Sequence, residues 1–142
     1  ALAGLELQDK TVVDYGCGSG ILAIATLLLG AKSAIGVDID PQALSATKDN
    51  TINNGLAPSS LACYLPGDEP KQQADIVVAN ILAGPLTSLE PTLMGLLKPG
   101  GLLVLSGLLQ EQKASILEAY TAIDFHHSDT TDQWLCLMGH KI

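Results

Sequence analysis

Three glycines at alternate positions separate a β-rich run from an apolar helical run. Residues 11–15 read Thr-Val-Val-Asp-Tyr, residues 21–29 are rich in leucine and isoleucine, and Gly16, Gly18 and Gly20 lie between them. Glycine lets the backbone turn sharply and approach a ligand closely, and the start of a helix offers unpaired N–H groups. This order predicts an α/β fold with a ligand site at the carboxyl end of its first strand.

The rest of the chain continues the alternation of strands and helices. The predicted strands cover residues 33–37, 61–65, 75–79 and 102–105, the predicted helices cover residues 41–53, 85–97 and 110–122, and a final antiparallel pair covers residues 125–130 and 133–138. The strands read as continuous apolar runs, which is typical of strands covered on both faces. The pattern predicts one domain over residues 1–142, a doubly wound, Rossmann-like α/β sheet that is mostly parallel, with an antiparallel last strand and helices on both faces.

Composition excludes several classes of protein. The chain has 142 residues, of which 47% are hydrophobic and 15% charged, so it is not disordered. Its longest apolar run, residues 21–31, is too short to cross a bilayer, and no basic region precedes an apolar stretch as in a secretory signal. The three cysteines, Cys17, Cys63 and Cys136, are an odd number without metal-ligand spacing. We therefore expect a cytoplasmic protein with no membrane contact and no metal site.

The charge balance bears on the partners. Seven lysines and no arginine stand against fifteen aspartates and glutamates, giving a net charge of −8. Nucleic-acid binding uses a basic footprint in which arginine is favoured, so we expect no direct nucleic-acid contact from this domain. Attraction of a basic protein or a cationic cofactor and ordinary solubility both remain compatible with this charge.

An aspartate after the second predicted strand indicates an adenosine-containing cofactor. Asp38 comes 18 residues after Gly20, close to the spacing of a ribose-binding carboxylate. The alternative role of Asp38 is to cap the following helix, a role that Asp40 and Pro41 already fit. A dinucleotide-binding loop would need a third glycine where Ile21 stands. An NAD-dependent dehydrogenase is therefore a distant alternative.

The first acid of the loop also favours a cationic ligand. Asp14 directly precedes the glycines, and a sulfonium or an ammonium group tolerates this carboxylate better than a pyrophosphate does. The pattern Asp-x-Gly-x-Gly-x-Gly is similar to the first motif of class I S-adenosylmethionine-dependent methyltransferases.

An asparagine after the fourth predicted strand points to the acceptor group. Asn80 is expected at the carboxyl edge of the sheet, beside the glycine loop. Amine-directed methyltransferases often carry an Asn-Pro-Pro-Tyr-like motif there, which accepts hydrogen bonds from the amine, whereas the residues here are Asn-Ile-Leu-Ala. The alternative role of Asn80 is that of a simple turn residue.

Together these stretches resemble one narrower family. Residues 14–25, residues 36–41, residues 78–83, Pro99-Gly100-Gly101 and Ser106-Gly107 are similar to the PrmA family of bacterial methyltransferases, which modify ribosomal protein L11. The resemblance covers the chain from Thr11 to its end, and Asn-Ile-Leu-Ala is its most specific piece. It implies S-adenosylmethionine as the cofactor and the lysine and N-terminal amines of ribosomal protein L11 as the substrate.

The resemblance also implies roles for individual residues. Asn80 is the candidate catalytic residue and also lies against the cofactor. The other implied cofactor-binding residues are Asp14, Gly16, Cys17 and Gly18 around the methionyl part, Asp38 at the ribose, Ile39, and Asp68 near the adenine. For Asp68, an acid in a turn, simple solvation is the alternative.

The chain departs from the family in one respect. Family members have an N-terminal substrate-recognition domain, a linker and a Gly- and Thr-containing segment that encloses the cofactor. None of these is recognised here, so we expect a catalytic-domain fragment whose turnover by itself stays open. The helix at residues 21–29 is apolar nearly all round, and a helix on a sheet needs only one apolar stripe. We therefore expect a further N-terminal segment to cover it.

The chemistry expected is an in-line displacement that depends on proximity and alignment. No general base is evident: His126 and His127 are adjacent and should point to opposite faces of a strand, and His140 is near the end. Trp134 is expected to be a packing anchor. The alternatives are an amine-, RNA- or small-molecule-directed methyltransferase and a non-catalytic module that only binds the cofactor.

Overall fold

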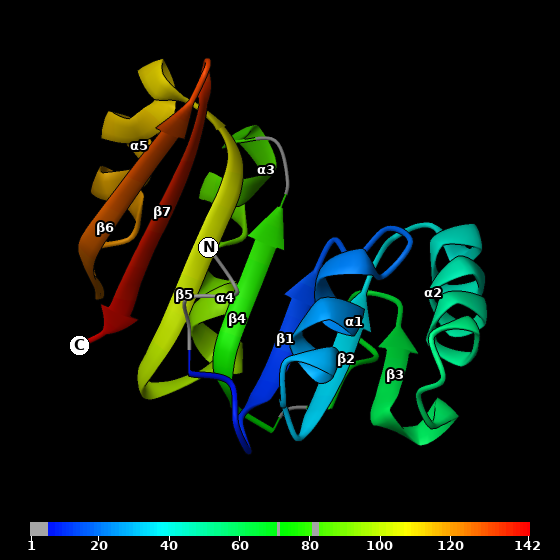
Figure 1. Cartoon of the computed structure of the whole chain (residues 1–142). Coiled ribbons are helices and arrows are strands. Elements are labelled where there is room, and N and C mark those ends of the chain that lie inside the picture. Colours follow the sequence, from blue (N-terminus) through cyan, green and yellow to red (C-terminus); the bar gives the residue numbers. More distant parts are fainter. Residues whose placement is uncertain (1–5, 71, 81–82) are drawn as a thin grey trace. The chain divides into compact units, whose positions relative to one another are not determined.

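The computed structural model describes residues 6–70, 72–80 and 83–142. The chain divides into two compact units, Ala1–Pro70 and Lys71–Ile142 (Figure 1). The first unit contains the glycine loop, and the second contains Asn80.

The first unit is a parallel α/β arrangement. Its strands are β1 (Thr11–Tyr15), β2 (Ser33–Val37) and β3 (Leu61–Tyr64), and its helices are α1 (Ile21–Leu28), α2 (Pro41–Asn53) and the 3-10 turn η2 (Pro58–Ser60). β2 pairs in parallel with both β1 and β3, and the register aligns the last residues of all three strands. The loops that follow the strands therefore begin at one edge.

Local sequence explains the bounds of the helix α2. Asp40 is its N-cap, and the Asp40 carboxylate accepts a hydrogen bond from the Gln42 N–H at 2.9 Å. Pro41 occupies the first turn, where a missing N–H costs nothing. The predicted helix over residues 41–53 is confirmed, as are the predicted strands over residues 11–15 and 33–37.

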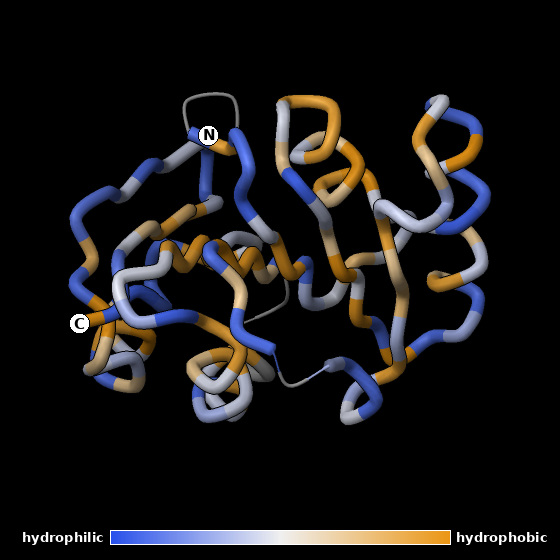
Figure 2. Tube along the Cα trace, turned by 90° about the horizontal axis from the view of Figure 1, so that it is seen from below, coloured by the Kyte–Doolittle hydropathy of each residue, from blue (hydrophilic) through white to orange (hydrophobic). Residues whose placement is uncertain are grey.

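The helix α1 keeps an apolar exposed side. Ala23, Ile24 and Thr26 are buried, whereas Ile21 and Leu28 are 70% and 58% exposed. Figure 2 shows hydrophobic colour along most of α1, whereas polar residues alternate with apolar ones along α2. The all-round apolar character read from the sequence therefore corresponds to a helix with one buried and one open side.

The second unit is mixed. Its strands run in the order β4 (Ala74–Asn80), β5 (Leu97–Leu109), β7 (Trp134–Lys141) and β6 (Ile123–Thr131), and its helices are α3 (Ala83–Ser88), α4 (Glu90–Leu96), the 3-10 turn η3 (Gln110–Gln112) and α5 (Lys113–Ala119). β4 and β5 are parallel, whereas β7 is antiparallel to both β5 and β6. The mostly parallel α/β class with an antiparallel strand near the end is thus confirmed.

Several bounds in the second unit differ from the prediction. The helix predicted over residues 85–97 is two helices, α3 and α4, separated at Leu89, because Pro91 fits the first turn of a new helix. The strand predicted to begin at Leu102 already begins at Leu97, which pairs with Ala74 before a register shift. The helix predicted over residues 110–122 is η3 followed by α5.

None of the helices that the structure describes combines the length and the apolar character that crossing a bilayer requires.

Candidate functional site

The glycine loop is fastened to the end of β2 by its own backbone. The N–H groups of Gly16 and Cys17 donate to the Val37 carbonyl at 2.7 and 3.1 Å. Gly16, Gly18 and Gly20 have φ angles of 80°, 56° and 84°, a region that side chains with a Cβ rarely adopt. Glycine is therefore required by the backbone path at these positions.

Asp38, the first residue after β2, binds the glycine loop through its carboxylate. One oxygen of the Asp38 carboxylate accepts the Gly18 N–H at 2.9 Å, and the other accepts the Asp40 N–H at 3.0 Å. Asp40 caps α2 and Asp38 does not, which resolves the alternative that the sequence left open. Because an ionised carboxylate has about four acceptor positions, Asp38 retains capacity for the hydroxyls of a ligand.

Two side chains of α2 that the sequence did not single out support the loop. The Thr47 hydroxyl donates to the Gly18 carbonyl at 3.0 Å, and the Asn50 amide donates to the Ser19 carbonyl at 2.9 Å. A Cβ at Gly20 would lie 2.6 Å from Thr47 Cγ2, so α2 packs directly against the loop. Thr47 and Asn50 are three residues apart and hence on one helix face, which is the signal that could have revealed them.

Asp14 is a buried acid without a partner. Its residue is 1% exposed, and neither carboxylate oxygen has a hydrogen-bond partner among the described residues. Burial raises the pKa of Asp14 to about 7; the nearby Ala23 N–H offsets part of this rise without completing a hydrogen bond, and the charge of Asp38 adds to it. An unpaired buried carboxylate favours a cationic ligand, because a positive charge would compensate its lost hydration.

Cys17 contributes packing rather than reactivity. Its side chain is buried, and its sulfur lies 3.0 Å from the position of a Cβ on Gly36. Burial raises the pKa of the Cys17 thiol to about 11, although the Thr47 hydroxyl partly offsets this. The thiol form therefore dominates, and the Cys17 backbone is already bound to β2.

Ile39 and Asp68 lie at the ends of neighbouring strands. Ile39 follows β2 and is 82% exposed, which leaves an apolar surface open. Asp68 is exposed in the turn after β3, and its N–H donates to the Leu65 carbonyl at 3.0 Å. In the first unit, the loop, Asp38, Ile39 and Asp68 thus each follow the carboxyl end of a strand, and Asp38 is joined to the loop by a hydrogen bond.

Asn80 belongs to the second unit. It is the last residue of β4, is exposed, and pairs in register with Ser106 of β5. Residues 81–82 of the Asn-Ile-Leu-Ala stretch lie outside the described residues. The expectation that Asn80 lies beside the glycine loop therefore stays a prediction.

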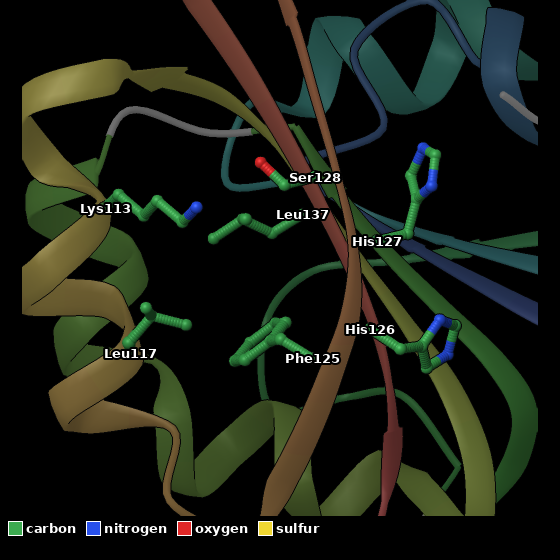
Figure 3. A pocket seen from close by; sticks show the side chains of 7 residues that line it. All are labelled: Lys113, Leu117, Phe125, His126, His127, Ser128 and Leu137. Atoms are coloured by element: carbon green, nitrogen blue, oxygen red, sulfur yellow. The ribbon is translucent and has the colours of Figure 1, made fainter.

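The histidines disagree with the prediction in one respect. The register between β6 and β7 shifts between Phe125 and His127, which is a β-bulge. Figure 3 shows that His126 and His127 point to the same side of β6, whereas Phe125 points toward α5. The predicted opposite orientation is wrong because the bulge inserts one extra residue. His126 instead stacks on His140, with a ring nitrogen distance of 2.7 Å.

Trp134 is also placed differently from expected. It begins β7 and is 52% exposed, so the prediction of a packing anchor is wrong.

Within the described ranges, no three histidine, cysteine, aspartate or glutamate side chains gather as metal ligands do.

The residues around the loop fit S-adenosylmethionine. The orphaned Asp14 carboxylate suits the positive charge of the cofactor, and nothing lies within 4 Å of a Cβ position on Gly18, so the backbone there is open to a ligand. A mostly parallel α/β fold with a glycine loop tied to an acid after the second strand defines a class I S-adenosylmethionine-dependent methyltransferase.

Comparison with known proteins narrows this class. The family model described as "Ribosomal protein L11 methyltransferase (PrmA)" matches residues 1–142, and the chain belongs to this family. It is 56% identical over 141 residues to the "Ribosomal protein L11 methyltransferase" of Pseudomonas paraeruginosa, covering 99% of this chain and 48% of that protein. The chain thus spans about half the length of the curated relatives that it matches.

Solved structures agree with the fold. The crystal structure of the ribosomal protein L11 methylase from Lactobacillus delbrueckii subsp. bulgaricus matches with a TM-score of 0.90 and 32% identity, over 99% of this chain and 75% of that one. An RNA methyltransferase from Salinibacter ruber in complex with S-adenosyl-L-homocysteine matches with a TM-score of 0.76 and 15% identity, over 95% of this chain and 83% of that one. The second likeness shows the fold alone.

Proposed function

We propose that the chain is the methyltransferase domain, over residues 1–142, of an enzyme that transfers methyl groups from S-adenosylmethionine to the lysine and N-terminal amines of ribosomal protein L11. Membership in the PrmA family supports the substrate. The observation that carries the cofactor assignment is the hydrogen bond from the Gly18 N–H to Asp38, beside the unpartnered carboxylate of Asp14.

The residues of the first unit have separate tasks in this proposal. When bound, S-adenosylmethionine supplies an electrophilic methyl group on a sulfonium. Asp38 accepts hydrogen bonds from the ribose hydroxyls, and the methionyl part lies against the backbone of Gly16, Cys17 and Gly18. Asp14 compensates the positive charge.

Two further residues shape the nucleoside end of the proposed site. Ile39 offers an exposed apolar surface after β2, and Asp68 follows β3. An apolar side chain suits an adenine face, and a carboxylate can accept a hydrogen bond from an adenine amino group.

Asn80 acts on the amine. A lysine must be neutral to attack, although its ordinary pKa is about 10.4. The amide oxygen of Asn80 accepts a hydrogen bond from the neutral amine and thereby orients its lone pair. Desolvation of the amine lowers its pKa and favours the reactive form.

The proposed setting follows from the substrate. A ribosomal protein substrate places the enzyme in the bacterial cytoplasm, where the three cysteines, which are free thiols, stay reduced. The net charge of −8 favours a basic protein as the partner and disfavours direct contact with nucleic acid.

The first test is calorimetric titration of the chain with S-adenosylmethionine and, separately, with NAD. We expect binding of S-adenosylmethionine alone, and its loss in Asp38→Ala. Asp40→Ala is the matched control, because it removes an acid two residues away that only caps α2. Binding of NAD, or equal effects of the two variants, would contradict the cofactor assignment.

The second test is methyl transfer from labelled S-adenosylmethionine to ribosomal protein L11. We expect label in the native protein and none in ribosomal protein L11 with acetylated amines, because acetylation removes the nucleophile. Asn80→Ala should lower transfer much more than it weakens cofactor binding, because the amide orients the amine and contributes only one of several contacts to the cofactor. Label in the acetylated protein would refute an amine acceptor.

A further inference from the structure

Two side chains of α2 donate hydrogen bonds to consecutive carbonyls of the glycine loop. Thr47 is fully buried and donates to the Gly18 carbonyl, and Asn50 is half-buried and donates to the Ser19 carbonyl, at 3.0 and 2.9 Å. Neither side chain belongs to the residues assigned above to the cofactor. Their hydrogen bonds fix the orientation of two neighbouring peptide planes.

The hydrogen bond from Thr47 to the Gly18 carbonyl determines where the Ser19 N–H points. In a trans peptide the carbonyl and the next N–H point in opposite directions, and the described chain contains no cis peptide. Because the Gly18 carbonyl faces α2, the Ser19 N–H faces away from α2. The described residues offer the Ser19 N–H no acceptor, whereas the Gly18 N–H donates to Asp38 and the Gly20 N–H donates to the Cys17 carbonyl.

The loop needs these hydrogen bonds because its glycines leave the backbone flexible. Gly18 and Gly20 flank Ser19, and glycine permits far more backbone conformations than other residues. Without the two hydrogen bonds, the peptide between Gly18 and Ser19 could rotate and present its carbonyl oxygen in place of the N–H. A carbonyl oxygen repels an anionic group, whereas an N–H that donates to a carboxylate makes a strong, charge-assisted hydrogen bond.

We infer that Thr47 and Asn50 are positioning residues that hold the Ser19 N–H toward the carboxylate of the amino-acid part of S-adenosylmethionine. This inference rests on the proposed function. It assigns to α2, which carries no residue of the predicted site, the task of selecting ligands that bear the amino-acid part over ligands that contain the nucleoside alone.

Two ligands separate this role from a general structural one. S-adenosylhomocysteine carries the amino-acid carboxylate, whereas 5′-methylthioadenosine has the same nucleoside thioether without it. Titration of Thr47→Val should show about a tenfold loss of affinity for S-adenosylhomocysteine and no more than about a twofold change for 5′-methylthioadenosine. Asn50→Ala should likewise weaken the binding of S-adenosylhomocysteine and leave the binding of 5′-methylthioadenosine nearly unchanged. Thr47→Ser keeps the hydroxyl and should retain most of the wild-type affinity for S-adenosylhomocysteine.

The chain offers a matched control on the same helix. Thr51 is also buried, and its hydroxyl donates to the Thr47 carbonyl at 2.7 Å without touching the loop. Thr51→Val should destabilise the fold about as much as Thr47→Val while leaving both affinities unchanged. Thermal unfolding followed by circular dichroism checks that both variants are folded.

The loop itself provides a readout without turnover. The amide resonance of Ser19 should move on addition of S-adenosylhomocysteine and stay in place on addition of 5′-methylthioadenosine. In the free Thr47→Val protein, amide hydrogen exchange should be faster over residues 18–20 than in the wild-type protein. Thr51→Val should leave exchange there unchanged.

The outcomes are distinguishable. If the wild-type chain binds neither ligand, the proposed function fails and this inference fails with it. If the wild-type chain binds both ligands but Thr47→Val weakens both equally, or weakens neither, the positioning role is refuted and the cofactor assignment stands.

Discussion

The two units of the molecule hold their candidate functional groups in different ways. In the first unit, the glycine loop is bound by Val37, Asp38, Thr47 and Asn50, all through backbone groups of the loop. In the second unit, Asn80 is an exposed residue at the end of a strand. A loop held at several points is organised before its ligand arrives. A single exposed side chain keeps rotamer freedom until its partner orders it.

The difference has a physical reason in the proposed reaction. The cofactor is the same molecule in every turnover, so a rigid loop reduces the entropy lost on binding. In the proposed reaction the acceptor amines would lie on different segments of a protein substrate, and an exposed amide can adapt to each of them. Stability should therefore respond most strongly to changes behind the loop of the first unit.

The largest expected effect concerns Asp14. Its pKa is about 7 in the folded chain and about 3.9 when unfolded, so the folded state holds the proton more tightly. The free energy of unfolding of the wild type should therefore fall as the pH rises from about 4 to about 7. Asp14→Asn removes this loss, and its stability relative to the wild type should increase by roughly 4 kcal/mol across that window.

Urea unfolding at about pH 4 and about pH 8 measures this difference. Asp49→Asn, which changes an exposed acid on α2, is the control and should follow the wild-type curve. Parallel curves for Asp14→Asn and the wild type would contradict the buried, unpartnered state of Asp14.

The next effect concerns the contact between Gly20 and Thr47. Gly20→Ala should cost about 3 kcal/mol, because its φ is 84° and the new Cβ would lie 2.6 Å from Thr47 Cγ2. Gly18→Ala is the control at φ 56°, where nothing lies within 4 Å, and should cost about 1 kcal/mol. Denaturant unfolding of both variants checks this; equal losses would argue against tight packing of α2 on the loop.

A smaller effect is expected in the second unit at Tyr120. This side chain is 1% exposed, and its hydroxyl donates to the Leu86 carbonyl of α3. Burial raises the pKa of Tyr120, and the charge of Glu90 adds to the rise, so the hydroxyl remains a donor. Tyr120→Phe should cost about 1–2 kcal/mol in the free energy of unfolding, because it leaves the Leu86 carbonyl without this donor.

Tyr64→Phe is the matched control for Tyr120→Phe. The described part of the chain offers the Tyr64 hydroxyl no hydrogen-bond partner, and the change should stay within about 0.5 kcal/mol. A loss at Tyr120 as large as that at Gly20 would break the contrast between the two units.

The smallest effect is expected at the ion pair of Lys98 and Asp75. Their charged atoms lie 3.1 Å apart, and the two side chains are 47% and 26% exposed. Lys98→Met should change the free energy of unfolding by about 0.5 kcal/mol or less, because exposed ion pairs gain little over hydration. Urea unfolding with and without added salt measures this; a loss above about 1 kcal/mol would mean that the pair is more than a surface contact.

Local sequence signals that end strands and begin helices explain why the element bounds of the first unit were predicted well. The end of β1 at the glycines and the start of α2 at Asp40 and Pro41 depend on residues adjacent in the chain. In the second unit, β5 begins at Leu97 because Leu97 pairs with Ala74, which is distant in sequence. The bulge at His126 likewise depends on the register with β7. Pairing across a sheet is a tertiary property that a single-sequence pattern does not contain.

The residues of the candidate site likewise fall into those that the sequence indicated and those that only the structure revealed. The loop, Asp38 and Asn80 carry recognisable spacing, and their placement at strand ends follows from the strand pattern, although the role of each stays a prediction. Thr47 and Asn50 looked like ordinary polar residues of a surface helix, and only the packing of α2 showed that they bind the loop.

The sequence by itself determined the family, the α/β class and the glycine loop, because each depends on residue types at short, fixed spacing. Only the tertiary structure decided that Asp14 has no partner among the described residues, that Asp38 closes the loop rather than capping α2, and that α2 orients the loop carbonyls. These features depend on which side chains meet across distances in the chain. Burial and hydrogen bonding are properties of that meeting, and residue order alone does not specify them.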